Sequence, residues 1–153
     1  MFYHRTGTFD SLAYDKNRAS KLRLVKGGGA HGALVYCGRD PIGWCQFGPR
    51  EELPRVDRKK GYVPTSPDAW RITCLFIERR HRRTGFAELA VRESVRAMKR
   101  LGVGRVEAYP VEGKLSASFL WSGTPELFEG AGFAKVGPLG KRSWVYSLDL
   151  RGS

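Results

Sequence analysis

The densest group of chemically useful side chains lies in residues 78–93, ERRHRRTGFAELAVRE, where four arginines surround His81. Gly85 then precedes a run with helical periodicity. The start of a helix exposes N–H groups without acceptors, and the helix dipole adds about half a positive charge there. This geometry binds phosphate when no side chain blocks the approach, and Gly85 removes one. The stretch therefore predicts a phosphate-binding loop. A solvated strand-to-helix loop and a basic nucleic-acid patch are the alternatives.

The elements on either side of this loop must position it. WRITCLFI, residues 70–77, is apolar on both faces and rich in β-branched and aromatic residues, which predicts a central strand. A helix is expected over about 85–101, with an inward stripe made of Ala87, Ala90, Val91, Ser94, Met98 and Leu101. A second strand follows at 104–111. Strand, helix and strand in this order form a parallel crossover unit.

The remaining patterns complete a mixed fold. A short helix is expected at 17–26, a hairpin at 33–47, a helix from Thr124 to Gly132, and two strands at 133–137 and 143–149. Residues 48–68 hold four prolines and many charges. A connection this long is often a loop over a binding site, although a flexible surface insertion fits equally well.

The loop resembles a known signature. Residues 82–87, RRTGFA, fit the R/Q-x-x-G-x-G/A pattern of the GNAT acetyltransferase superfamily, and they follow a strand and open a helix as in that superfamily. ELFEGAGFAKVG (126–137) and DPIGWCQFGP (40–49) are similar to its late helix and to its second and third strands. The resemblance covers about residues 33–149. It implies an α/β fold with a twisted mixed sheet of about six strands flanked by helices, in a single domain spanning residues 1–153.

The resemblance also implies a site for acetyl-CoA. The backbone of Leu75, Phe76 and Ile77 is expected to run beside the pantetheine arm. The pyrophosphate is expected on the backbone amides of Arg82, Arg83, Thr84, Gly85, Phe86, Ala87 and Glu88. The implied reaction moves an acetyl group to an amine, either on a small molecule or on a protein.

An alkyl amine is protonated at neutral pH and must lose a proton before it attacks the thioester. Glu107 is the candidate base, because it shares a strand face with Arg105 and Tyr109. Pairing of Glu107 with an arginine is the alternative, and Glu78 is a weaker candidate base. Tyr109 is the candidate partner in proton transfer.

The sequence departs from the family at two places. Phe128 stands where the family often has a tyrosine that protonates the departing thiolate, so Tyr109, Ser122 or water would have to serve. Phe128 is still expected to line the cofactor site, and loss of transfer with retained cofactor binding is an alternative. The first strand and helix of the family also find little counterpart here. An exposed sheet edge at that position would favour a homodimer.

Composition excludes little on its own. The formal charge of +12 attracts any polyanion, but the basic residues are scattered and no aromatic-rich recognition motif accompanies them, so nucleic acid is a secondary expectation. Three cysteines in apolar runs predict buried, reduced thiols. The three histidines are expected to be isolated surface residues, and no metal is expected. No apolar run approaches the ~20 residues of a membrane span. A cytoplasmic enzyme is the expectation.

Overall fold

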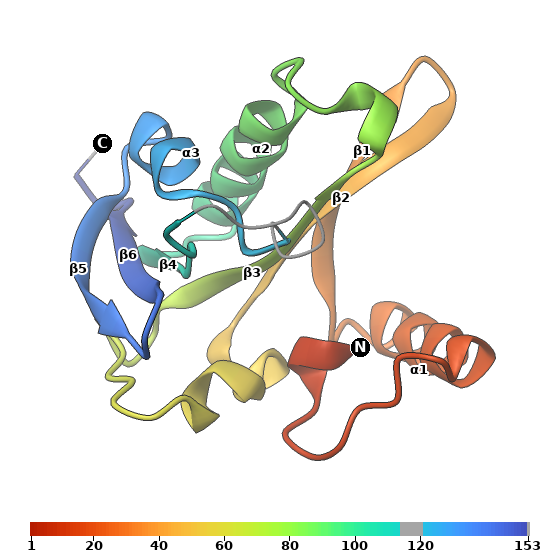
Figure 1. Cartoon of the computed structure of the whole chain (residues 1–153), viewed down its shortest axis with the longest axis horizontal. Coiled ribbons are helices and arrows are strands. Elements are labelled where there is room, and N and C mark those ends of the chain that lie inside the picture. The colour runs from red at the N-terminus through yellow and green to blue at the C-terminus, as the bar shows by residue number, and fades with distance from the viewer. Residues whose placement is uncertain (114–120, 153) are drawn as a thin grey trace.

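A computed structural model describes residues 1–113 and 121–152. Its centre is a six-stranded sheet in the order β1-β2-β3-β4-β6-β5 (Figure 1). The strands are β1 (His31–Cys37), β2 (Asp40–Gly48), β3 (Trp70–Ile77), β4 (Arg105–Ala108), β5 (Ala134–Leu139) and β6 (Ser143–Asp149). The pair β3 and β4 is parallel, and the other four pairs are antiparallel. The predicted mixed sheet and its parallel crossover are therefore confirmed.

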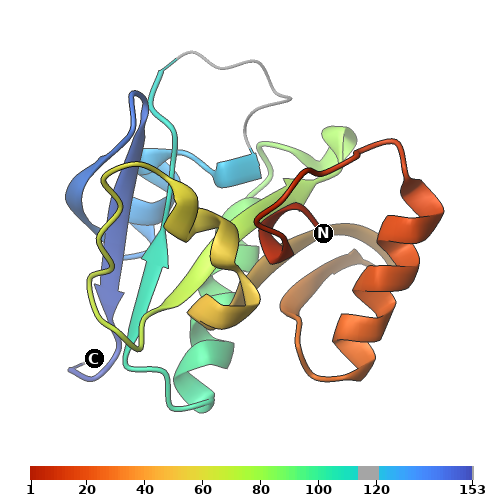
Figure 2. The same cartoon turned by 90° about the horizontal axis from the view of Figure 1, so that it is seen from below.

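Helices cover both faces of this sheet. The helices are α1 (Tyr14–Lys26), α2 (Phe86–Arg100) and α3 (Pro125–Gly130), with short 3-10 turns η1 (Phe2–His4), η2 (Arg50–Glu52), η3 (Pro54–Arg58) and η4 (Arg79–His81). Helices α2 and α3 lie on one face, while α1 and the turns η1 and η3 lie on the other, as Figure 2 shows from below. No helix in the described ranges has both the length and the apolar composition needed to cross a bilayer.

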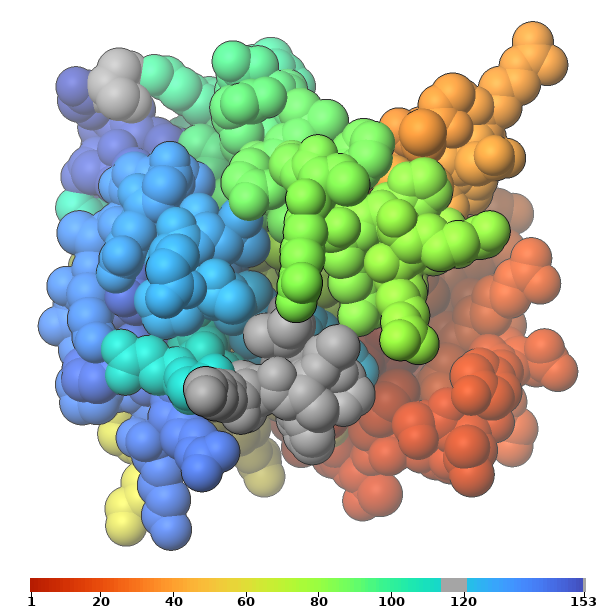
Figure 3. All heavy atoms as spheres, turned by 45° about the horizontal axis from the view of Figure 1, so that its top comes forward, coloured from red at the N-terminus to blue at the C-terminus, as the bar shows by residue number. Residues whose placement is uncertain are grey.

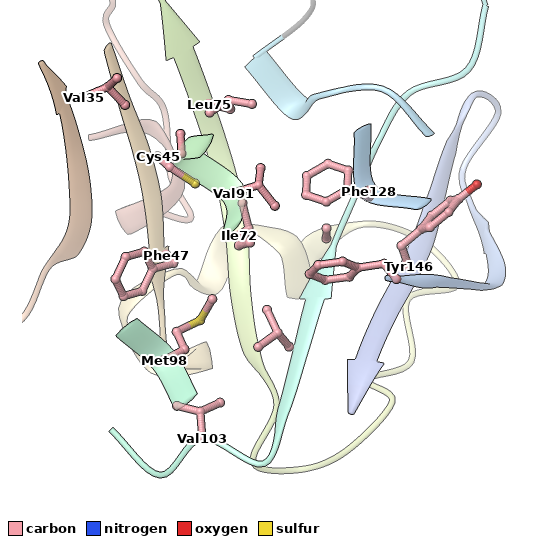
Figure 4. Close-up of a cluster of buried hydrophobic side chains, with 14 of the residues drawn as sticks. Val35, Cys45, Phe47, Ile72, Leu75, Val91, Met98, Val103, Phe128 and Tyr146 are labelled. Atoms are coloured by element: carbon pink, nitrogen blue, oxygen red, sulfur yellow. The ribbon is translucent and has the colours of Figure 1, made fainter. Parts of the chain in front are cut away.

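Helix α2 holds the main core against the sheet. Ala90, Val91, Ser94 and Met98 are buried as the stripe predicted, and Figure 4 shows Val91 and Met98 beside the side chains of β2 and β3. Each fully buried aliphatic side chain of this size contributes about 1.5–3 kcal/mol. The prediction for Leu101 was wrong, since it is 60% exposed. The helix has ended at Arg100, and Leu101 lies in the turn that follows.

The strands β3 and β4 form a fork. They pair from Trp70 opposite Val106 to Ile72 opposite Ala108, and β3 then continues to Ile77 without β4 beside it. Figure 4 shows the two ribbons diverging towards the end of β3 that carries Leu75. Strand β4 is short and ends at Ala108, because Pro110, two residues later, has no N–H to donate to a ladder.

Other expectations needed correction. Helix α1 begins at Tyr14 rather than 17, and its Leu22 and Val25 are about half exposed. Residues 48–68 are not structureless, because η2 and η3 form inside them. Cys45 and Cys74 are buried as expected, but Cys37 is exposed at the end of the edge strand β1, where no further strand covers it.

Candidate active site

The loop between β3 and α2 is folded by its own side chains. Arg82 Nε donates to the Ile77 carbonyl at 2.9 Å, and Thr84 Oγ1 donates to the His81 carbonyl at 2.5 Å. The Arg80 guanidinium pairs with the Glu78 carboxylate at 2.8 Å. These contacts turn the chain sharply after the strand, so the loop presents the start of α2 to the surface.

The start of α2 is uncapped. Gly85 has φ +84, a left-handed conformation that glycine adopts without strain. Within the described residues no side chain caps this end, and the first helical backbone bond runs from Leu89 N–H to the Gly85 carbonyl at 3.0 Å. The N–H groups of residues 86–88 precede that bond and have no intrahelical acceptor. A Cβ placed on Gly85 would meet no atom within 4 Å, so the space beyond the turn is open.

A surface pocket lies near this turn. In Figure 3 the loop lies at the front of the molecule, between α3 and the β1–β2 hairpin. A pocket of about 570 Å³ opens between α2 and α3 beside Glu88, and Arg92 and Arg96 line its α2 wall. Glu126 lines the α3 wall. An extended ligand with its phosphates at Gly85 would therefore find a groove of mixed charge next to it.

The residues expected beside the pantetheine arm lie on the unpaired part of β3. Leu75 and Ile77 are buried, whereas Phe76 is 48% exposed. Past Ile72 no strand of the described residues pairs with β3 on the β4 side, so the backbone there lacks a ladder partner, although the Ile77 carbonyl already accepts from Arg82. A ligand that enters the fork can replace the missing strand.

Glu107 lies beneath the long connection between β2 and β3. Its side chain is fully buried and accepts four hydrogen bonds. The Tyr62 and Tyr109 hydroxyls donate to Oε2 at 2.5 and 2.6 Å, while the Thr65 N–H and hydroxyl donate to Oε1 at 2.5 and 2.7 Å. The carboxylate is therefore saturated with donors from Tyr109, which directly follows β4, and from residues 62–65.

A second buried charge stands beside it. Arg71 on β3 is the register partner of Glu107 on β4 and is also fully buried. Its guanidinium pairs with Asp57 at 2.6 Å and donates to the Tyr62 oxygen at 3.0 Å, so Tyr62 bridges the two charged groups. Burial alone would raise the pKa of Asp57, but the hydrogen bond and the charge of Arg71 lower it.

Tyr109 keeps its proton in this network. Burial first, and then the neighbouring Glu107 carboxylate, raise the pKa of Tyr109 well above its ordinary value. A protonated phenol can donate a hydrogen bond or a proton. The structure thus brings together Glu107 and Tyr109, the two residues predicted to share proton transfer, and adds Tyr62 and Thr65 to them.

Phe128 packs in the core instead of standing free. It is 1% exposed, and its ring centroid lies 5.3 Å from that of Phe133 in an edge-to-face contact. Figure 4 shows its ring near Val91 and Tyr146. The Thr124 hydroxyl accepts from the Leu127 N–H and so caps α3, as its sequence predicted.

The sequence of residues 4–118 matches the Acetyltransferase (GNAT) family. The chain belongs to this family. Among solved structures, the fold is similar to an N-acetyltransferase from Staphylococcus aureus, with 15% identity, a TM-score of 0.63, and coverage of 94% of this chain and 81% of that one. A ribosomal-protein-S5-alanine acetyltransferase from Vibrio fischeri has 12% identity and a TM-score of 0.63, with coverage of 99% and 81%. The PaiA N-acetyltransferase from Thermoplasma acidophilum, solved with coenzyme A, has 11% identity and a TM-score of 0.60, with coverage of 90% and 71%.

These comparisons confirm the predicted fold and the predicted class of enzyme, an acetyl-CoA-dependent N-acetyltransferase. Comparison with curated proteins found no match.

The GNAT chain also contains a polar cluster that its sequence did not reveal. His4 Nδ1 lies 2.7 Å from the Glu52 carbonyl, which can only accept, so this nitrogen carries the proton. His4 Nε2 is then the acceptor, and two donors, Lys21 Nζ at 2.7 Å and Gln46 Nε2 at 2.6 Å, share its single lone pair. Burial, and then the charge of Lys21, lower the pKa of His4 to about 4. The expectation of an isolated surface histidine was therefore wrong for His4.

Proposed function

We propose that this GNAT enzyme binds acetyl-CoA with its pyrophosphate on the backbone amides of residues 82–88 and transfers the acetyl group to an amine. The observation that carries the proposal is the uncapped start of α2 at Gly85. Several N–H groups and the positive end of the helix dipole converge there. The open space beside Gly85 admits a phosphate, so the residues present fit the group.

The pantetheine arm and the nucleotide of the cofactor can each be assigned to a neighbouring part of the surface. The pantetheine arm would enter the fork beside Leu75–Ile77 and satisfy backbone groups that β4 leaves unpaired. The nucleotide end would lie towards the groove between α2 and α3, where Arg92 and Arg96 supply positive charge. The chain turns between these two parts at Gly85, and this turn supports the proposal that the pyrophosphate lies at the bend.

The reaction requires a neutral amine. Its nitrogen forms a bond to the thioester carbon, the carbon–sulfur bond breaks, and the thiolate leaves with the electron pair. The amine loses one proton and the thiolate gains one. Glu107 is the proposed acceptor of the first proton, directly or through water. Glu107 can accept this proton only if the hydrogen bond that it receives from Tyr62 or from Thr65 breaks first. Tyr109, held protonated beside Glu107, is the proposed donor to the thiolate.

The acceptor belongs to a broad class. Two of the similar structures are ribosomal-protein-alanine acetyltransferases, from Brucella melitensis and Vibrio fischeri. A peptide with an amino-terminal alanine therefore belongs in an acceptor panel, together with small alkyl amines and polyamines. Release of coenzyme A thiol with any member of the panel would separate an active transferase from a protein that binds the cofactor without transfer, the alternative that Phe128 raises.

Calorimetric titration with acetyl-CoA tests the cofactor site. Wild type is expected to bind, and Gly85→Glu is expected to abolish binding by placing bulk and negative charge at the bend. Gly28→Glu is the matched control, because Gly28 has φ +72 and equally open surroundings but lies at the end of α1. Wild-type binding weaker than about 1 mM, or equal loss in both variants, would refute the proposal.

A further inference from the structure

Thr73 occupies an unusual position in β3. Towards β2, Cys74 pairs with Gln46 and Ile72 pairs with Phe47, so Thr73 is an extra residue that forms a bulge. Towards β4, the ladder has already ended at Ile72. Thr73 is thus the first residue of β3 beyond the fork, and it has no register partner on either side. Bulges of this kind redirect side chains and occur next to active sites.

The bulge changes the direction of the following side chains. Ile72 and Leu75 both belong to the core cluster that packs under α2, although two residues stand between them instead of one. Regular alternation would place residues 72 and 75 on opposite faces. The extra residue, Thr73, therefore lies where the alternation of side chains between the two faces of the sheet is interrupted, at the apex of the fork.

The hydroxyl of Thr73 has no hydrogen-bond partner among the described residues. Thr73 is 3% exposed, and its Oγ1 makes no hydrogen bond to the described part of the chain. Ser94 shows the usual arrangement nearby in the core, where its buried hydroxyl donates to the Ala90 carbonyl at 2.7 Å. A buried hydroxyl without a partner destabilises the folded protein, because it has lost its hydrogen bonds to water and gained none in return. Such a group in a native protein calls for an explanation, and a ligand is one.

The position along β3 identifies which part of the ligand reaches Thr73. Ile77, where the strand enters the loop, is four positions beyond Thr73, and four steps span about 13 Å at the rise of a strand. If the pyrophosphate lies at that loop, the arm runs back along β3. Its thioester end then lies at the apex of the fork.

We propose that Thr73 Oγ1 donates a hydrogen bond to the thioester carbonyl oxygen of acetyl-CoA. This rests on the proposed cofactor site. When the amine nitrogen bonds to the carbonyl carbon, the carbonyl π pair moves onto this oxygen, and it returns when the carbon–sulfur bond breaks. Thr73 keeps its proton throughout and stabilises the negative charge on the oxygen. A donor already stripped of water, as this hydroxyl is, needs no reorganisation and acts more strongly than one in solvent.

Infrared difference spectroscopy on the full chain tests the hydrogen bond without an acceptor. The probe is acetyl-CoA labelled with carbon-13 at the carbonyl. Bound to wild type, its carbonyl stretch is expected at lower frequency than in Thr73→Val, because a hydrogen bond weakens the C=O bond. Thr73→Ser keeps the hydroxyl and is expected to restore the shift. Equal frequencies in all three proteins would overturn the inference.

Kinetics provides the second readout. With an amine that wild type acetylates, Thr73→Val is expected to lower kcat by about 10- to 100-fold with little change in the Kd for coenzyme A, and Thr73→Ser to recover most of kcat. Weaker coenzyme A binding with unchanged kcat would overturn the assignment, since the hydroxyl would then contact the arm.

Thermal unfolding distinguishes the loss of a catalytic hydrogen bond in Thr73→Val from damage to the fold. The ligand-free Thr73→Val protein is expected to be at least as stable as wild type, because a methyl group replaces an unpaired hydroxyl. Absence of acetyl-CoA binding in wild type would instead refute the proposed function.

Discussion

The Tyr62 hydroxyl donates a 2.5 Å hydrogen bond to the Glu107 carboxylate and so fastens the long β2–β3 connection onto β4. The same hydroxyl accepts from Arg71, the register partner of Glu107 on β3. Tyr62 therefore joins two buried charges that are not in direct contact in any ion pair of the described residues. Glu107, the candidate base, also holds in place the β2–β3 connection that covers it. The same carboxylate therefore contributes to the fold and to the proposed reaction.

Glu107→Gln is expected to destabilise the fold. The carboxylate accepts four hydrogen bonds with two oxygens, whereas an amide offers one acceptor oxygen and places its NH₂ against donors. A loss of about 2 kcal/mol in the free energy of unfolding is expected by urea titration. Tyr62→Phe removes one donor to Glu107 and the acceptor of one Arg71 N–H, and it is expected to cost about 1–2 kcal/mol.

The double variant completes this test. If the two residues act as one unit, the losses of Glu107→Gln and Tyr62→Phe should fall short of additivity by at least about 0.5 kcal/mol. Unchanged stability in Glu107→Gln together with abolished transfer would show that the carboxylate serves chemistry alone.

Arg83→Asn is expected to separate binding from stability. Arg83 is exposed and has φ 63, a conformation in which asparagine is favoured over arginine. The free energy of unfolding should stay the same or rise by a few tenths of a kcal/mol, while the Kd for acetyl-CoA rises about 3- to 10-fold through loss of a cation near the phosphates.

Arg79→Asn is the control for Arg83, because it removes the same charge from an exposed residue of the same loop. Equal losses of affinity in the two variants, measured by calorimetry at low and at high salt, would show a general effect of net charge rather than a contact of Arg83.

The sequence predicted those features of the fold that depend on residues close together in the chain. The apolar run of β3, the buried stripe of α2 and the glycine between them are set by residues that are near neighbours in the chain. The stripe failed at Leu101 because periodicity alone does not mark where a helix ends. The candidate phosphate loop came from the same local reasoning.

The covering of Glu107 could not be predicted in this way. Tyr62 lies 45 residues from Glu107 in the sequence, and the side chains of His4 and Gln46 meet across 42 residues. No periodicity connects such pairs, because they meet only when the sheet has brought its strands and connections together. The bulge at Thr73 is likewise a property of pairing with β2 and is invisible in an apolar run.

Phe128→Tyr is expected to reduce stability without a gain in rate. The ring edge of Phe128 is enclosed, since a Cβ on Gly123 would lie 2.7 Å from its Cε2 and 3.3 Å from its Cζ. A hydroxyl added at Cζ would be buried or would displace its neighbours, at a cost of about 1–3 kcal/mol. Phe133→Tyr, at the ring that Phe128 contacts, should lose a similar amount. Faster thiol release in Phe128→Tyr alone would show instead that its hydroxyl reaches the thiolate.

The stability of the chain should depend on His4 in acid. Its pKa falls from an ordinary 6.5 to about 4 on folding, because burial and then the charge of Lys21 oppose protonation. Between these values the unfolded chain binds more protons than the folded chain, so the stability from neutral His4 is complete above pH 6.5 and declines as the pH falls towards 4. His4→Asn cannot titrate but can still donate to the Glu52 carbonyl.

Urea titrations of wild type and His4→Asn at several values from pH 7.5 to 4.5 measure this contribution. The difference in unfolding free energy between the two proteins should be constant above pH 7 and should shrink steadily below pH 6.5, because acidification weakens wild type more than the variant. Titrating carboxylates are common to both proteins and cancel in the difference. Parallel curves over the whole range would mean that His4 titrates alike in the folded and unfolded chains, and that the cluster with Lys21 and Gln46 does not hold it neutral.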